Sequence, residues 1–438
     1  MNFDESIAYL LALGNEVSAM KLGLENIGKL LAALGNPEKN YVKIQIAGTN
    51  GKGSTCAFLE AICVCAKIKT GLTTSPHLIS VTERIKIDGR EIGEKDFARH
   101  ATKIRELSEQ IAAENKLETV PTYFEQLTAI ALNAFAEAKV ELAILETGLG
   151  GRFDATTAAN AEIVAITPID FDHQQILGNT LAEIASEKAA IIREDTKVIV
   201  APQPSHAVQI IQEKCREVGV KPIFIQSDVE VNQLVDKDAL EVTITTKTDV
   251  YSRLRLSLAG RHQFVNASLA VEIAETLRDV GFKITPDNVI NGLETAKHNG
   301  RLEFSHGILF DGAHNIAGAK ALKNYFDEFI TQPITLVFGV MRDKDLPEIA
   351  EILFPKAKNL IFTKPDNPRS MQTADLMKFL PQGFVKDNVY QTETVEKALE
   401  TAKKISSAED LICVTGSLYL VGEAQRLLIE SNEKRAFA

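Results

Sequence analysis

The sequence has no long apolar run, no paired cysteine motif and no excess of positive charge, and each absence excludes a class of protein. No segment approaches the roughly 20 apolar residues that a membrane-spanning helix requires, and no basic region followed by an apolar stretch opens the chain. We therefore expect neither export nor a membrane span. The net charge of -11 and the pI near 5.4 argue against nucleic acid or an anionic membrane as a partner, because both need a broad positive surface.

Cysteines are few, odd in number and placed mostly in apolar runs without CxxC spacing. They are Cys56, Cys63, Cys65, Cys215 and Cys413. Buried thiols in a reducing compartment explain this pattern, so we expect a cytoplasmic protein.

Length and composition predict two globular domains. The 438 residues exceed what one hydrophobic core supports, since single cores stop growing near roughly 250 to 300 residues. The chain is 45% hydrophobic and 24% charged, which is typical of a protein that buries a sizeable core in each domain.

The first part of the chain predicts an α/β domain with a mostly parallel sheet. The apolar run VKIQIAG, residues 42–48, leads into a glycine-rich turn and then into a helical pattern at 55–67. Four further strand-like runs alternate with helical stretches, at 142–145, 163–167, 198–201 and 223–226. Such alternation indicates strands covered by helices on both faces.

Alternating apolar residues between 229 and 258, interrupted by the polar turn KTD, predict an antiparallel hairpin appended to that sheet.

A second strand-helix series begins near Ile308 and predicts a smaller α/β domain of the Rossmann-like kind. Its strand-like runs are ILF, TLVFGV, LIFTK and LICVTG. A helix opened by Thr285 and Pro286 precedes it, and HNG at 298–300 is the expected hinge. We therefore predict a first domain at 1–297 and a second domain at 298–438.

The motif GTNGKGS predicts a phosphate-binding loop. It lies between a strand and a helix, where backbone N–H groups and the helix dipole favour an anion. Lys52 can reach the outer phosphates, and the hydroxyl of Ser54 or Thr55 can bind Mg²⁺. The spacing is shorter than in the common G-x-x-x-x-G-K-[ST] motif. On these residues alone, a glycine-rich turn with a solvated lysine stays an alternative.

Polar residues also follow the predicted strands. TSPHL, Glu146 and DFDH each come after an apolar run, and open α/β sheets bind ligands at the carboxyl ends of their strands. Each residue alone has an ordinary structural explanation: a turn, a solvated strand-end acid, a structural histidine. Lys188 is unremarkable by itself. If the strand ends converge on the phosphate loop, they form one site.

Taken together, the motifs resemble the folylpolyglutamate synthase branch of the Mur ligase family. They are GTNGKGS, TSPHL with ERI, ETGLGGRFDAT, DFDH with LG and EKAAI, HQFVNA, DGAHN and VTGSLYL, in this order along nearly the whole chain. The resemblance implies an ATP-binding amino domain and a Rossmann-like carboxyl domain, with the active site in the cleft between them.

The resemblance also implies roles for individual residues. Those for ATP are Gly48, Thr49, Asn50, Gly51, Lys52, Gly53, Ser54, Thr55, Asn266, Arg301 and Asp311. Those for Mg²⁺ are Ser75, Glu146, His173 and, at a second ion, Lys188 after carbamylation. His314, Ser417 and Arg84 resemble residues near the γ-phosphate or the incoming glutamate, and Tyr123, Phe124, Phe153 and Asp154 resemble a pterin-contacting region. A Tyr-Phe pair on a helix is otherwise core packing.

Three positions depart from the family pattern. His298-Asn299 stands where the family has Trp-Pro, Thr157 where it has Asn, and Ile316 where it has Pro. The first two leave the contacts to adenine and pterin open, whereas the phosphate chemistry is intact.

The implied activity is ATP-dependent ligation of L-glutamate to the γ-carboxylate of a reduced folate, by a monomer. Dihydropteroate is a further acceptor that the pterin region allows. A Mur-type ligase for another carboxylate is one alternative, although GKGS and TSPHL favour folate. A nucleotide switch without ligase activity is another alternative. Such a switch would release ADP without needing both a folate and L-glutamate.

Overall fold

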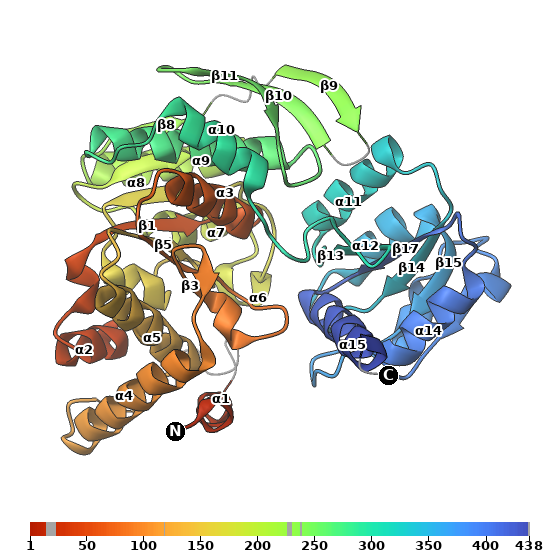
Figure 1. The fold of residues 1–438 in the computed structure, drawn as a ribbon, viewed down its shortest axis with the longest axis horizontal. Helices are drawn as coiled ribbons and strands as arrows, with labels where there is room; N and C mark the ends of the chain where they lie inside the picture. Colours follow the sequence, from red (N-terminus) through yellow and green to blue (C-terminus); the bar gives the residue numbers. More distant parts are fainter. Residues whose placement is uncertain (15–22, 118, 226–229, 237–238, 437–438) are drawn as a thin grey trace. The chain divides into compact units, whose positions relative to one another are not determined.

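The protein folds into two compact units, seen here in a computed structural model that describes residues 1–14, 23–117, 119–225, 230–236 and 239–436 (Figure 1). The first unit comprises Met1–Glu230, Thr243–Leu254 and Phe264–Ala296, and the second comprises Val231–Val242, Arg255–Gln263 and Lys297–Ala438. Two short segments between 230 and 263 therefore group with the second unit. The proposed hinge at 298–300 and the boundary at 297 stay predictions.

The first unit contains an eight-stranded sheet in the order β4-β3-β2-β5-β1-β6-β7-β8. Its strands are β1 Val42–Ala47, β2 Thr70–Thr73, β3 Ile85–Ile87, β4 Arg90–Glu91, β5 Leu142–Glu146, β6 Ile163–Ile166, β7 Lys197–Val200 and β8 Pro222–Phe224. The strands from β2 to β8 in this order pair in parallel, and β3 and β4 are antiparallel at one edge. This confirms the mostly parallel sheet.

Helices cover both faces of this sheet, with α3 on one side and α5 on the other (Figure 1). The α-helices are α1 Phe3–Ala12, α2 Glu25–Ala33, α3 Lys52–Cys65, α4 Glu94–Ala113, α5 Tyr123–Ala138, α6 Gln174–Leu177, α7 Leu181–Ala189, α8 Ser205–Glu217, α9 Gln263–Asp279 and α10 Pro286–Thr295. Short 3₁₀ turns are η1 Pro37–Asn40, η2 Val81–Arg84 and η3 Ala155–Ala159. The central strands are buried except at Val42, the first residue of β1, as expected for strands packed on both faces.

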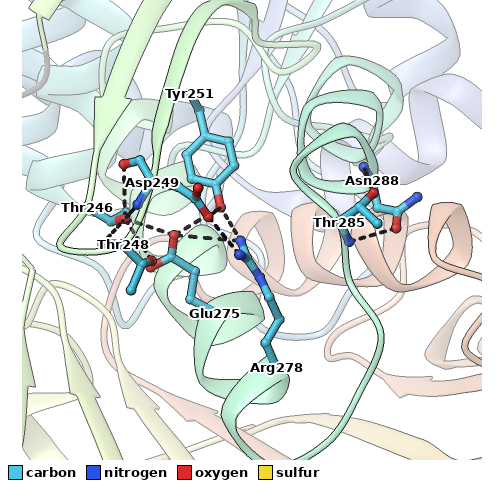
Figure 2. Close-up of polar contacts among 8 residues, drawn as sticks. All are labelled: Thr246, Thr248, Asp249, Tyr251, Glu275, Arg278, Thr285 and Asn288. Atoms are coloured by element: carbon cyan, nitrogen blue, oxygen red, sulfur yellow. Dashed lines mark hydrogen bonds and ion pairs between the residues drawn. The ribbon is translucent and has the colours of Figure 1, made fainter.

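Several helices begin at side-chain caps that satisfy their first N–H groups. Thr122 and Glu125 form a capping box at α5, and Thr180 and Glu183 form one at α7. Thr285 caps α10, where its Oγ1 accepts from Asn288 N at 3.2 Å (Figure 2). The predicted Thr-Pro start of this helix is confirmed.

The predicted hairpin is present as β10 Ala239–Thr245 and β11 Val250–Arg255, joined by a tight turn in which Thr246 N donates to Asp249 O at 3.0 Å. It has a third strand, β9 Glu230–Asp236, and forms its own sheet in the order β11-β10-β9, so it does not extend the eight-stranded sheet as predicted. Two stretches of the expected pattern, 226–229 and 237–238, lie outside the described residues.

A buried polar cluster fastens the hairpin turn to α9 (Figure 2). Glu275 accepts from Thr246 Oγ1 at 2.8 Å and from the Tyr251 hydroxyl at 2.9 Å. Arg278 donates to Asp249 at 2.7 Å and also to the Tyr251 hydroxyl. Because the Tyr251 side chain is 1% exposed, its hydroxyl joins an acid and a base that water reaches poorly.

The second unit has a six-stranded sheet in the order β12-β13-β17-β14-β15-β16. Its strands are β12 Glu303–Ser305, β13 Ile308–Asp311, β14 Ile334–Phe338, β15 Ala357–Phe362, β16 Val389–Gln391 and β17 Leu411–Thr415. Its helices are α11 Ile316–Phe329, α12 Leu346–Leu353, η4 Phe354–Lys356, α13 Thr373–Leu376, η5 Met377–Phe379, η6 Lys386–Asn388, α14 Val395–Ile405 and α15 Leu418–Ala436. Only β12 pairs antiparallel, so the predicted Rossmann-like α/β character is confirmed.

All five cysteines are free thiols, and four of them are buried. Within the described ranges, none of the helices has the length and apolar character that crossing a membrane requires.

The polar cluster on α9 predicts a measurable loss of stability. We expect Tyr251→Phe to lower the free energy of unfolding by about 1–3 kcal/mol, because Glu275 and Arg278 lose a shared buried partner. Urea unfolding followed by circular dichroism checks this. Val250→Ala is the matched control: Val250 is 65% exposed on the same hairpin, so its truncation should change stability by less than about 0.5 kcal/mol. Equal effects of the two substitutions would contradict the prediction.

Candidate active site

The phosphate loop lies at the carboxyl end of the central strand β1. Gly48 and Gly51 adopt positive φ angles of 146° and 90°, which favour glycine. Neighbouring side chains also leave no room for a larger residue. A Cβ on Gly48 would lie 1.8 Å from Thr167 Oγ1, and one on Gly51 would lie 2.1 Å from Asn266 Oδ1. The loop is thus built for close backbone approach, and Asn266 lies against it; the contact of Asn266 with ATP stays a prediction.

Helix α3 starts at Lys52, three residues earlier than the sequence pattern predicted. Its N-terminal N–H groups therefore belong to the loop, where they favour an anion. Lys52 Nζ donates to the carbonyl oxygens of Gly48 and Thr49 at 3.2 Å each, which holds the ammonium group over the loop. Thr55 Oγ1 is buried without a hydrogen-bond partner, while Ser54 is 5% exposed.

The strand order brings three other predicted loops to the same edge of the sheet. Strand β1 lies between β5, which ends at Glu146, and β6, which precedes DFDH; β2, which precedes TSPHL, lies beyond β5. Because these strands are parallel, their carboxyl ends share one edge. The convergence that the sequence analysis required is therefore present.

Hydrogen bonds tie these loops to one another. Thr49 Oγ1 donates to Asp170 O and accepts from Asp170 N, both at 3.0 Å. Ser75 N donates to Glu146 Oε2 at 3.1 Å. His173 adopts a positive φ of 49° and precedes α6. The phosphate loop is thus bonded to the DFDH loop, and the TSPHL loop is bonded to the end of β5.

The donor set predicted for Mg²⁺ is one carboxylate, one hydroxyl and one imidazole. Ser75 Oγ is buried and has no hydrogen-bond partner, so it has capacity for a ligand. The described residues contain no group of three or more His, Cys, Asp or Glu that could hold a metal. One carboxylate and one hydroxyl would suit Mg²⁺ bound together with phosphate, since Mg²⁺ takes one or two protein carboxylates alongside phosphate oxygens and water.

Lys188 on α7 is a buried lysine of the first unit. It is 4% exposed, and its Nζ donates to Gly48 O at 2.8 Å. Burial lowers the pKa of Lys188 to about 7, and the charge of Lys52 adds to the effect, while Asp172 and Asp154 oppose it. A lysine that looked unremarkable in the sequence therefore has a buried amine with a lowered pKa next to the phosphate loop.

The predicted pterin region splits into buried and exposed parts. A Cβ on Gly148 would lie 2.7 Å from the Phe124 ring, so this ring packs against the glycine-rich loop after β5. Asp154 is buried and accepts from Gly148 N and Leu149 N at 2.9 Å each, which makes it a brace of the same loop. Phe153 is 40% exposed.

Arg84 and Tyr123, also assigned to the substrate, lie together. Arg84 is 4% exposed and its guanidinium carbon lies 5.7 Å from the centre of the Tyr123 ring, a cation–π geometry.

The remaining predicted residues belong to the second unit, around the end of β13. Asp311 is buried and accepts from Leu302 N at 3.0 Å and from Ala313 N at 2.9 Å. Burial raises the pKa of Asp311, and the Arg301 charge works against this. His314 Nδ1 donates to Gly312 O at 2.7 Å, since a carbonyl oxygen can only accept.

Ser417 lies at the carboxyl end of β17, where its Oγ accepts from Leu420 N at 3.1 Å and so caps α15.

The sequence analysis missed two residues near these sets. Thr167, whose Oγ1 is buried without a partner, follows β6 directly, and this position was a usable signal. His77 is part of the quoted TSPHL motif and accepts from Arg84 Nε at 2.7 Å.

Comparison with known proteins identifies the family. Residues 46–274 match the Mur ligase middle domain, and residues 300–418 match the Mur ligase glutamate ligase domain. The chain belongs to the Mur ligase family. Its relatives place it in the folylpolyglutamate and dihydrofolate synthase branch, whose activity is the ATP-dependent joining of glutamate to folates.

Two relatives and one solved structure illustrate this placement. Dihydrofolate synthase/folylpolyglutamate synthase of Bacillus subtilis is 33% identical over 420 residues, covering 93% of this chain and 95% of that protein. A probable bifunctional folylpolyglutamate synthase/dihydropteroate synthase of Haloferax volcanii is 32% identical over 97% of this chain. The matched region spans 50% of the length of that relative. Folylpolyglutamate synthase of Mycobacterium tuberculosis, complexed with ADP and AMPPCP, superposes with a TM-score of 0.86 at 32% identity, covering 97% and 98% of the two chains.

The lowered pKa of Lys188 predicts a pH-dependent gain from its removal. Between pH about 7 and 10.5 the unfolded amine holds a proton that the folded amine has lost, so unfolding becomes harder as pH rises through this window. Below pH 7 the full penalty of burying the charge remains. We expect Lys188→Met to raise the melting midpoint by about 4 °C near pH 6.5 and by clearly less near pH 9.5.

Thermal melts in bicarbonate-free buffer check this prediction. Lys95→Met removes an exposed lysine on α4 and should shift the midpoint equally at both pH values. A Lys188→Met gain that does not change with pH would contradict the assigned titration.

Proposed function

We propose that the chain activates the γ-carboxylate of a reduced folylpolyglutamate with ATP and joins it to the amine of L-glutamate. The observation that carries this proposal is the order β2-β5-β1-β6, which sets the phosphate loop between three loops bearing metal and substrate candidates. A phosphate-binding loop alone would serve any nucleotide protein. Acidic, hydroxyl and amine groups around it serve phosphoryl transfer to a second substrate.

The chemistry requires two steps, because a carboxylate is too electron-rich to accept an amine. A carboxylate oxygen of the folate attacks the γ-phosphorus of ATP, and ADP leaves, which gives an acyl phosphate. The glutamate amine then attacks the acyl carbon and expels phosphate as the amide bond forms. Such transfers depend mainly on positioning and charge neutralisation.

Lys52 and the first N–H groups of α3 supply the positive field for the phosphates. Lys52 Nζ is held over the loop by Gly48 O and Thr49 O, so its charge is in place before ATP binds. Asn266 packs against Gly51 and is proposed as a nucleotide contact.

Mg²⁺ would be held by Ser75, Glu146 and His173. The orphaned Ser75 hydroxyl and the link from Ser75 N to Glu146 support this set. When bound, the ion neutralises charge on the transferred phosphoryl group.

Carbamylation of Lys188 belongs to the same proposal, as a ligand for a second Mg²⁺. A carbamate forms when the neutral amine adds to CO₂ and loses a proton, which converts a cation into an anion with two oxygens. The pKa of about 7 supports this step, because a large part of the amine is then neutral at physiological pH.

Arg301 and Asp311 of the second unit are proposed as contacts of the nucleotide. His314 and Ser417 of the same unit are proposed as contacts of the γ-phosphate or the glutamate. Buried Asp311 in its frame of backbone donors supports a fixed contact point. We also propose that the protein is a monomer in the cytoplasm. Its free thiols support a reducing compartment.

Dihydropteroate is the second candidate acceptor. The Phe124 ring packed on the loop after β5 and the exposed Phe153 offer aromatic surface to a pterin. The Bacillus subtilis relative, similar over nearly its whole length, carries both activities in its name.

Measuring ADP release tests the ligase. We expect release only when L-glutamate and an acceptor are both present, with tetrahydrofolate and dihydropteroate assayed in parallel. Lys52→Ala should reduce turnover by at least about 100-fold with an unchanged melting midpoint, whereas Lys95→Ala should match the wild type. ADP release without acceptor at the same rate would leave a nucleotide switch as the better explanation.

Chemical rescue tests the role of Lys188. We expect Lys188→Ala to lose activity and to regain part of it in short carboxylic acids, because these can replace a carbamate near the loop. A signal from ¹³C-bicarbonate bound to the wild type and missing in the variant provides a second readout. Full activity of Lys188→Ala in plain buffer would remove this residue from the site.

A further inference from the structure

His77 stands out because no role had been assigned to it, although its side chain makes a short bond to an assigned residue. It lies in the TSPHL loop, two residues after the metal candidate Ser75. Its Nδ1 accepts from Arg84 Nε at 2.7 Å. Arg84 itself is 4% exposed and packs over the Tyr123 ring.

The loop that carries His77 is held at several points. Glu83 accepts from the backbone N–H groups of Leu78, Ile79 and Ser80 at 2.7–2.8 Å. Thr74 N donates to Arg84 O at 3.1 Å. Backbone and side chain of Arg84 are thus both bonded to one preorganised loop.

The same loop reaches the metal candidates. Ser75 N donates to Glu146 Oε2 at 3.1 Å, so Glu146 is linked by a hydrogen bond to Ser75, which the backbone connects to His77 two residues later. A displacement of the loop would move Arg84 and the Ser75 hydroxyl together.

His77 can act here only as a neutral acceptor. An Arg Nε–H always donates, so Nδ1 must be unprotonated and Nε2 must carry the ring proton. While this bond is made, Nδ1 is engaged as an acceptor and is not available as a general base.

We propose that His77 is a positioning residue, whose bond to Arg84 fixes the plane of the guanidinium group for an anionic group of the folate acceptor. This inference rests on the proposed function, which assigns Arg84 to the substrate. One bond to Nε sets the direction of the whole guanidinium fork, because the fork is planar and rigid. Without it, the guanidinium loses a bond that holds its plane, and its orientation toward the acceptor is less well defined.

Steady-state kinetics of His77→Ala test the proposal. We expect the KM for the folate acceptor to rise by about tenfold, as for the loss of one bond to a charged group, while the KM for ATP stays unchanged and kcat falls by less than about threefold. His77→Asn should restore most of the loss, because its Oδ1 can accept in place of Nδ1. His206→Ala, an exposed histidine on α8, is the control and should leave every constant unchanged.

A double-mutant cycle shows whether His77 works through Arg84. Once Arg84 is replaced by Ala, adding His77→Ala should change the folate KM by less than about twofold, since positions that act through one contact are not additive. Additive effects would overturn the proposal. A pH profile of kcat/KM that loses one limb in His77→Asn would also overturn the proposal, because this loss would indicate proton transfer by His77.

The outcomes also separate this inference from the proposed function. An unchanged folate KM in Arg84→Ala would refute the assignment of Arg84 to the substrate. A raised KM in Arg84→Ala together with a normal KM in His77→Ala would refute the positioning role alone. Melting midpoints of His77→Asn close to the wild type show that the comparison is made on folded protein.

Discussion

Two lysine ammonium groups meet at the carbonyl oxygen of Gly48, and the chemistry of the first unit depends on this arrangement. Lys52 reaches that oxygen from the start of α3 at 3.2 Å, and Lys188 reaches it from α7 at 2.8 Å. Gly48 can present the oxygen because its φ of 146° is open to glycine. Burial and then the charge of Lys52 depress the pKa of Lys188, so the lysine of the phosphate loop favours the neutral form of the second one.

The sheet supplies the rigid frame for this pair. Strands β5 and β6 flank β1 and are fully buried, so the loops at their ends start from fixed points. Thr49 bonds the phosphate loop to Asp170, and Ser75 bonds the TSPHL loop to Glu146. The candidate site is thus a set of short loops bonded to one another at one edge of a packed sheet, which limits the reorganisation needed when substrate binds.

Local signals predicted the parts of this frame that depend on neighbours in sequence. The phosphate loop, Glu146 at the end of an apolar run and the Thr-Pro start of α10 follow from backbone rules that act over a few residues. The third strand β9 had no strong pattern of its own. The buried cluster of Tyr251, Glu275 and Arg278 joins residues more than 20 positions apart, and spacing rules do not reach so far.

Taken alone, the sequence determined the α/β class, the phosphate loop and, through ordered motifs, the family, because these depend on short-range patterns and on residue identity. Tertiary structure alone decided which strand ends share an edge, that Lys188 is buried against Gly48, and that His77 faces Arg84. The physical reason is that burial and Coulomb interactions act between atoms close in space, and only the fold places residues 48 and 188, or 77 and 84, within hydrogen-bond distance.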